Sequence, residues 1–172
     1  LKIYTTINSH MQLYAEEAVA QNVAAKQRIF KQFSNIKSGS VFKGREKELE
    51  KFMKQSDRWR AQKEDEMSDE ENKETFFKPV PMKIFAWNAK RETDTTMTPM
   101  DSIKYLKTLL QSGFMSMEPQ TGFVKAWVGG IDYKTFKIDH ANITMKRQVG
   151  STIKPMLYCQ AIEEAGFTPE TP

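Results

Sequence analysis

The sequence is poor in the side chains that most often bind metals or form covalent cross-links. Its 172 residues include a single cysteine, Cys159, and two histidines, His10 and His140. One cysteine excludes an internal disulfide, and a structural zinc site draws on several cysteine and histidine ligands. We therefore expect no disulfide framework, no metal centre and no cofactor, and we expect Cys159 to be a buried, small apolar side chain.

Long apolar runs and phosphate-binding loops are missing as well. No stretch approaches the roughly 20 apolar residues of a transmembrane helix, and a composition of 39% hydrophobic and 28% charged residues predicts a soluble segment. Neither G-x-x-x-x-G-K-[ST] nor G-x-G-x-x-G occurs, so no nucleotide site is indicated. The net charge of +4 comes from interleaved acidic and basic residues. Because they do not cluster, nucleic acid is not an expected partner.

A serine and a lysine stand three residues apart in the segment 147–155, Arg-Gln-Val-Gly-Ser-Thr-Ile-Lys-Pro. Three residues are nearly one helical turn, so Ser151 and Lys154 are predicted to share one face of a helix that ends near Gly166. A serine hydroxyl is a weak nucleophile until a neighbouring base takes its proton. The pair therefore indicates acyl transfer through a covalent serine. The four residues alone are more often a serine N-cap followed by a solvated lysine, so the context decides.

The surrounding segments resemble a known family. Upstream of the pair lies Thr-Gly-Phe-Val-Lys-Ala-Trp-Val-Gly-Gly over 121–130, and the chain begins with Tyr-Thr-Thr-Ile-Asn over 4–8 and Met11-Gln12. Further matches are 15–19, 98–103 and 111–114. In this order they resemble the transpeptidase domain of class A penicillin-binding proteins, the bifunctional peptidoglycan synthases. The resemblance extends over nearly the whole chain.

This resemblance implies a function and its chemistry. The implied activity is D,D-transpeptidation of peptidoglycan, in which Ser151 attacks a D-alanine carbonyl of a stem peptide and Lys154 is the general base. β-Lactam antibiotics would acylate the same serine. A helix N-terminus carries partial positive charge, and burial of Lys154 against a sheet would further favour its neutral, basic form. The sequence therefore predicts Ser151 and Lys154 as the catalytic residues.

The resemblance also implies a fold and a location. The expected fold is α+β, an antiparallel sheet flanked by helices, as a partial penicillin-binding/serine β-lactamase-like transpeptidase fold with a charged helical insertion. The parent protein would lie in the bacterial cell envelope, at the periplasmic face of the cytoplasmic membrane. It would be anchored there through a segment outside this sequence. Other cell-wall synthesis proteins are its possible partners.

Two motifs that complete the site in this family, S-x-N and K-T-G, do not follow Lys154. In the family the K-T-G strand supplies part of the oxyanion hole, and losing one oxyanion donor costs about 100- to 1000-fold in rate. We therefore interpret the sequence as an inactive fragment of a longer enzyme. Its expected parts are a first strand and helix over 1–33, a charged helical insertion or linker over 34–97, and a helix, hairpin and active-site helix over 98–172.

Residue patterns predict the elements that precede the site. The alternation over 1–7 predicts a strand, and the apolar spacing from residue 11 predicts a helix. The charge-dense segment 42–75 predicts one or two amphipathic helices, whereas the polar segment 88–96 predicts an exposed turn.

The elements closer to the serine carry clear start and stop signals. Thr98 and Pro99 mark the start of a helix, and Gly113 fits its C-terminal cap. Strands over 114–117 and 123–128 are expected to form a hairpin.

Three alternatives remain open. The first is a non-catalytic binding or β-lactam-sensing module that keeps S-x-x-K and works through its charged helical region. The second is a relative of the serine β-lactamases or carboxypeptidases, against which the hairpin and the Arg-Gln-x-Gly-Ser pattern argue. The third is a Ser/His/Asp site that uses His140 beside Asp139, which the lysine base makes unnecessary.

Overall fold

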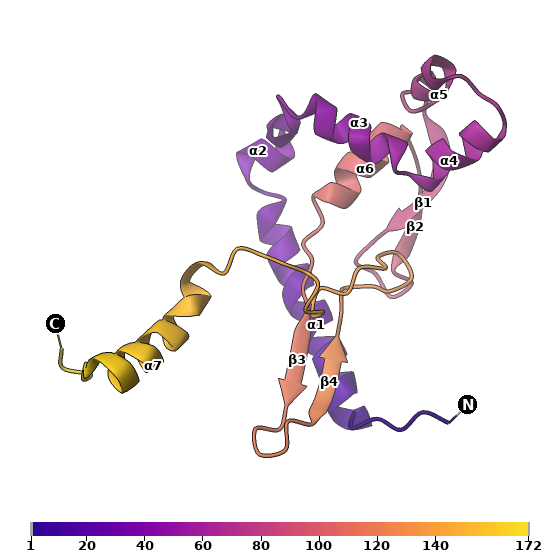
Figure 1. Ribbon diagram of the computed structural model, residues 1–172. Helices are drawn as coiled ribbons and strands as arrows, with labels where there is room; N and C mark the ends of the chain where they lie inside the picture. Colours follow the sequence, from indigo (N-terminus) through magenta and orange to yellow (C-terminus); the bar gives the residue numbers. More distant parts are fainter. Residues whose placement is uncertain (1, 172) are drawn as a thin grey trace. The chain divides into compact units, whose positions relative to one another are not determined.

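The structure, a computed structural model, describes residues 2–171 and has two compact units, Leu1–Ala141 and Asn142–Pro172 (Figure 1). Each unit is described by itself. The elements of the first unit are α1 (Ser9–Phe30), α2 (Ser34–Lys37), η1 (Ser40–Phe42), α3 (Glu46–Lys54), α4 (Asp57–Glu64), α5 (Asp69–Thr75), β1 (Val80–Phe85), β2 (Glu92–Met97), α6 (Pro99–Lys107), β3 (Phe114–Met117) and β4 (Val124–Val128). Those of the second are η2 (Gly150–Ile153) and α7 (Lys154–Ala165).

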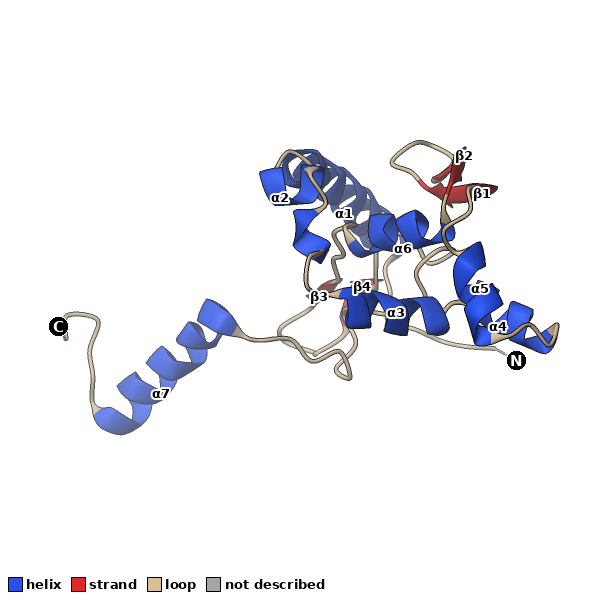
Figure 2. Ribbon diagram, turned by 90° about the horizontal axis from the view of Figure 1, so that it is seen from above, coloured by secondary structure: helices blue, strands red, loops and turns tan. Residues whose placement is uncertain are grey.

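The α+β class predicted from the sequence is confirmed. The strands form two separate antiparallel pairs, β1 with β2 and β3 with β4. Figure 2 shows the first pair in red, and Figure 1 shows the opposed arrows of the second. No helix within residues 2–171 combines the length and the apolar character needed to cross a membrane.

The first residues of the chain follow the edge of β4 without forming a strand. Residues 2–8 have no regular secondary structure, so the strand predicted over 1–7 is wrong for the described residues, and residue 1 lies outside them. The Thr6 hydroxyl donates to the Val124 carbonyl at 2.7 Å, and the Asn8 N–H donates to the Lys125 carbonyl at 2.9 Å. These isolated bonds cover one edge of the hairpin.

Helix α1 buries one face against β4. The buried positions recur every fourth residue, the spacing that brings side chains onto one helix face. This face belongs to a core of buried apolar residues: Ala15, Val19, Val23, Phe85, Leu109, Ala126, Val128 and Ile131. The core therefore joins α1, β1, β4 and the segments that follow α6 and β4.

Gln27 continues the buried row of α1 and is fully buried. Its Nε2 donates to the Thr108 carbonyl at 3.0 Å, and its Oε1 accepts from the Leu110 N–H at 2.7 Å. Gln27→Ala leaves both backbone groups without partners, and each buried unsatisfied group costs about 1–3 kcal/mol. We expect the free energy of unfolding to fall by about 3 kcal/mol in urea denaturation. The exposed Gln21→Ala of the same helix is the control, and an equal loss there would contradict a specific role for Gln27.

The charge-dense segment forms three short helices, α3, α4 and α5, so the prediction of one or two helices is wrong. Two serines set the breaks: the Ser56 hydroxyl accepts from the Trp59 N–H at 3.2 Å, and Ser68 forms a capping box with Glu71. Helices α3, α4 and α6 and the residue that follows α5 share a second core, made of Leu49, Met53, Trp59, Phe76 and Met100. Their apolar side chains therefore pack together while the charges face solvent.

The polar segment 88–96 is only partly a turn, because its second half belongs to β2. β2 pairs antiparallel with β1, with Val80 opposite Met97 and Phe85 opposite Glu92. Its sequence, Glu-Thr-Asp-Thr-Thr-Met, lacks the apolar alternation of a half-buried strand but is rich in β-branched threonine, which favours extended structure.

The start predicted for α6 is confirmed, because the Thr98 hydroxyl accepts from the Asp101 N–H at 3.0 Å and Pro99 is the first helical residue. The predicted end is wrong: α6 stops at Lys107, well before Gly113. The β3–β4 hairpin is confirmed, with Phe114 opposite Val128.

In the second unit, η2 runs directly into α7, and Gly166 ends the helix in the left-handed conformation with φ 68°. The helix predicted from near Ser151 to near Gly166 is therefore confirmed, while its role as an active-site helix stays a prediction. None of the described residues of this unit is buried. Cys159 is exposed, so the burial predicted for it is wrong.

Candidate functional site

Ser151 lies in the 3-10 turn η2, and Lys154 is the first residue of α7. The backbone N–H of Lys154 donates to the carbonyl of Ser151, which closes the turn between them. In a 3-10 turn, side chains three residues apart eclipse one another. The two side chains therefore leave the backbone on the same side, while their catalytic role stays a prediction.

Among the described residues, no side chain caps the start of this helix. The preceding residues, Val149 and Ile153, provide no side-chain cap for η2 or α7. The neighbouring Thr152 hydroxyl donates to the Val149 carbonyl, whereas the Ser151 hydroxyl bonds to none of the described residues. Gly150 opens the turn with φ 52°, a left-handed conformation that glycine adopts at little cost. The serine thus stands free at the partly positive end of a helix.

Lys154 is exposed. The burial that was expected to favour its neutral form is therefore not present in the described structure, and that expectation is wrong.

The S-x-x-K spacing occurs twice more, at Ser34–Lys37 and at Ser40–Lys43. The Ser40 hydroxyl is engaged, since it accepts from the Ser38 hydroxyl at 3.1 Å. Ser34 opens α2, which has four residues, whereas the helix that follows Ser151 has twelve. The S-x-x-K spacing alone therefore does not distinguish Ser151 from Ser34 and Ser40. The longer helix that follows Ser151 does distinguish it.

The histidine alternative gains no support. Asp139 accepts from the Trp127 indole N–H at 2.9 Å and from the Ala141 N–H at 2.9 Å, so each of its oxygens already serves another group. The His140 N–H donates to the Gly129 carbonyl at 2.7 Å. These bonds fasten residues 139–141 to the end of β4, which is a structural role.

Besides the apolar packing of α1 on β4, one side chain of α1 forms hydrogen bonds with the hairpin. The Gln12 amide accepts from the Trp127 N–H at 2.8 Å and donates to the Trp127 carbonyl at 2.9 Å, so it occupies the place of a neighbouring strand. The loop after β4 is also tied to β2, because Lys134 donates to Glu92 at 3.1 Å. That hydrogen bond, followed by the charges of Lys134 and Lys83, lowers the pKa of Glu92 below its ordinary value.

Around these contacts lies a pocket of about 510 Å³, bounded by α1, Arg91 and residues 127–133 and 136–139. Sequence reasoning missed it, because its polar residues, such as Glu16 and Arg91, come from segments far apart in the chain and match no spaced motif.

Comparison with known families identifies the middle of the chain. Residues 25–110 match the family described as the penicillin-binding protein middle domain. The match contains the charged segment with α3, α4 and α5, and it ends before the β3–β4 hairpin and Ser151. It therefore establishes the family without testing the serine.

Similar proteins carry the same family name. Penicillin-binding protein 2D of Bacillus subtilis (strain 168) is 50% identical over 62 residues, which are 36% of this chain and 9% of that protein. Penicillin-binding protein 1A of Neisseria flavescens is 43% identical over 63 residues (37% and 8%). Penicillin-binding protein 1A of Escherichia coli (strain K12) is 44% identical over 55 residues (32% and 6%). The chain thus spans less than a tenth of each relative. No solved structure matches it.

Proposed function

The chain belongs to the penicillin-binding protein family, and from this we propose that it is part of a peptidoglycan D,D-transpeptidase with Ser151 as its nucleophile. The observation that supports this most directly is the turn that joins Ser151 to Lys154 at the uncapped start of α7. The motif order along the sequence supports it further. The partial transpeptidase fold, with S-x-N and K-T-G supplied from outside residues 1–172, is part of the proposal.

The proposed reaction uses both side chains. The Ser151 Oγ attacks the carbonyl carbon of the penultimate D-alanine, and its proton passes to the Lys154 Nζ, which is the general base. The amide C–N bond breaks, the terminal D-alanine takes the proton as it leaves, and an acyl-serine remains. An amine of a second strand then attacks this ester and regenerates the serine. The N–H groups at the start of the helix would stabilise the oxyanion.

The setting of this reaction is also proposed. The substrates would be peptidoglycan stem peptides, β-lactams would acylate the same serine, and the protein would work in the cell envelope at the periplasmic face of the cytoplasmic membrane. Because the relatives are so much longer than the matched segment, the site is expected to need further motifs.

Penicillin labelling tests the proposal. Residues 1–172 and the full-length natural protein are incubated with a fluorescent penicillin, and intact mass and peptide mapping locate the adduct. We expect one adduct, on the peptide that contains Ser151, in the full-length protein. Residues 1–172 should label at least about 100-fold more slowly, because they lack an oxyanion donor. No adduct in either protein, or an adduct on the peptide with Ser34 or Ser40, would contradict the assignment.

A binding or sensing module is the second candidate. The observation that favours it is that the family match covers the packed charged helices and not the serine. The two candidates differ in turnover. Release of D-alanine from a stem-peptide analogue supports the transpeptidase, whereas a stable penicillin adduct without any D-alanine release supports the sensor.

A further inference from the structure

The pocket at the end of β4 lies wholly within the first unit and plays no part in the proposed transpeptidation. Its volume of about 510 Å³ falls in the range of sites for small ligands, about 300–1,000 Å³. Its apolar wall includes the buried Val19 and Ile131 and the half-buried Phe136. A pocket with such a wall suits a ligand with apolar side chains.

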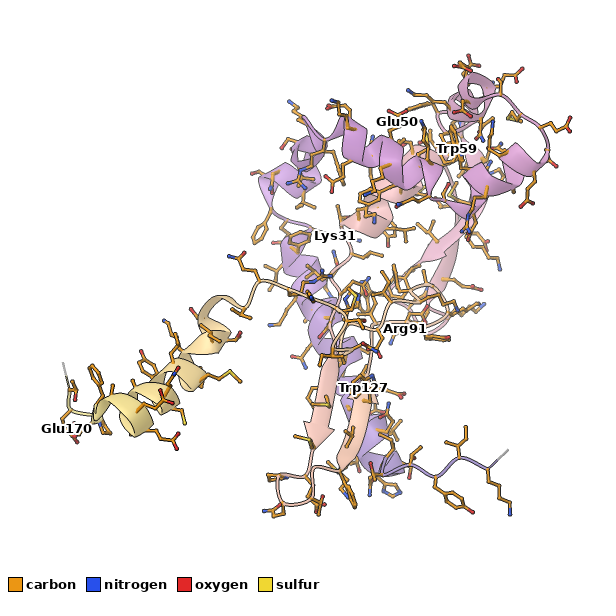
Figure 3. All side chains as sticks on the ribbon, in the orientation of Figure 1. Lys31, Glu50, Trp59, Arg91, Trp127 and Glu170 are labelled. Carbon is orange, nitrogen blue, oxygen red and sulfur yellow. The ribbon has the colours of Figure 1, made fainter. Side chains whose placement is uncertain are left out.

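Arg91 supplies a positioned positive charge to this pocket (Figure 3). It is a non-glycine residue with φ 57°, a conformation that costs roughly 1–2 kcal/mol. The Arg91 guanidinium lies 5.5 Å from the centre of the Trp87 ring, and the backbone N–H of Arg91 donates to the Asn88 carbonyl. Strained residues that their surroundings hold in place gather at ligand sites.

No carboxylate among residues 2–171 forms an ion pair with Arg91. The carboxylate beside it in sequence, Glu92, is paired with Lys83 at 3.5 Å and with Lys134 at 3.1 Å. A guanidinium without a carboxylate partner can bind the carboxylate of a ligand, because its fork of N–H groups matches the two oxygens.

The acidic residues of the pocket differ in what they can still bind. Asp139 is occupied at both oxygens, by the Trp127 indole and the Ala141 N–H. Asp132 accepts from the Thr135 N–H. Glu16 accepts only from the Gln12 amide, at 2.7 Å, through one of its oxygens. Glu16 and Asp132 therefore each keep one oxygen for a cationic group, and Glu16 is the one that lies on α1 about one turn before Val19 of the apolar wall.

We propose that this pocket binds a short zwitterionic peptide with apolar side chains. Arg91 binds the terminal carboxylate, Glu16 binds the terminal ammonium, and the wall of Val19, Ile131 and Phe136 receives the side chains. Because the lining carries acids as well as cations, a ligand with both charges fits it better than a simple anion. The pocket proposal rests on the proposed family but uses no residue of the second unit, so its failure would leave the transpeptidase proposal untouched.

The test uses the dipeptide leucyl-leucine, its N-acetyl form and its C-terminal amide. Binding to residues 1–172 is followed by NMR through the Trp127 indole N–H, assigned by its loss in Trp127→Phe, because this group lines the pocket and donates to Asp139. We expect leucyl-leucine to shift this signal saturably. Removing either terminal charge should weaken binding about tenfold, the effect of one charge-assisted hydrogen bond.

Two pocket variants and two neighbouring control variants test which side chains bind the terminal carboxylate and the terminal ammonium of the dipeptide. Arg91→Gln should bind leucyl-leucine about tenfold more weakly and lose its discrimination against the amide, whereas Glu16→Gln should lose its discrimination against the N-acetyl form. Lys90→Gln and Glu17→Gln remove the adjacent exposed charges and should bind within about twofold of the original protein.

Three outcomes would overturn the proposal: no shift of the Trp127 indole at millimolar dipeptide, equal binding of the three ligands, or equal losses in the pocket variants and their controls. Arg91→Lys guards against misfolding of Arg91→Gln. It keeps the charge without the fork and should bind with intermediate strength.

Discussion

Alanine at position 151 is expected to abolish the penicillin adduct of the full-length protein completely. The adduct is an ester to the serine oxygen, so removing that oxygen removes the only atom that can carry it. The fold should not change, because Ser151 is exposed and its hydroxyl holds no described residue. The measurement is intact mass after incubation with penicillin, with circular dichroism as the check on folding.

The chain provides its own matched controls. Ser34→Ala and Ser40→Ala remove the serines of the other two S-x-x-K segments and should leave the adduct at full yield. Lys154→Arg tests the base, because an arginine stays protonated and cannot accept the serine proton. Acylation should then slow by about 100- to 10,000-fold. Labelling that persists in Ser151→Ala, or that disappears in Ser34→Ala, would refute the assignment.

Gly113→Ala is expected to destabilise the first unit by about 3 kcal/mol or more, since forced overpacking costs about 1–3 kcal/mol even where side chains can adjust. A Cβ at position 113 would lie 2.6 Å from the Ala141 nitrogen and 2.7 Å from the His140 carbonyl carbon. Both atoms are backbone, so the segment that carries Asp139 must move. We expect a lower midpoint in urea and a shifted Trp127 indole signal.

Gly130→Ala is the matched control, because a Cβ there would meet its nearest neighbour, the Ile138 carbonyl oxygen, at an ordinary 3.6 Å. It should change the free energy of unfolding by less than about 1 kcal/mol, the usual scale for a tolerated substitution. If the two variants lost the same stability, the close approach at Gly113 would not be the cause.

Capping and turn residues predicted where several helices and strands lie. Contacts between residues far apart in the sequence determined the features that were predicted wrongly. The start of α6 followed from Thr98 and Pro99, and the β3–β4 hairpin followed from its alternation and turn residues. Gly113 was misassigned as a helix cap because the sequence does not show that residues 140–141 return to pass over it. For the same reason β2 was missed: its threonines are extended because β1 lies beside them.

The same distinction applies to the functional residues: those close together in sequence were predicted, and those brought together by folding were not. Ser151 and Lys154 lie within one turn, so their spacing alone predicted that they share a side. Glu16 and Arg91 lie far apart in sequence and line one pocket only after α1 packs on β4 and the β1–β2 turn approaches it. No periodicity or spacing in the sequence predicts that Glu16 and Arg91 line the same pocket; only the folded structure shows it.

The two edges of the β3–β4 sheet differ in whether another strand can pair with them. Thr6 and Asn8 already donate to the carbonyls of Val124 and Lys125, and the Gln12 amide pairs with the N–H and carbonyl of Trp127, so this side of β4 is covered. Within residues 2–171 no strand lies on the other side of β3, whose Phe114, Met115 and Met117 are exposed. An open, uncharged strand edge accepts further strands. This sheet is therefore extensible in one direction only, and any strand that joins it must do so beside β3.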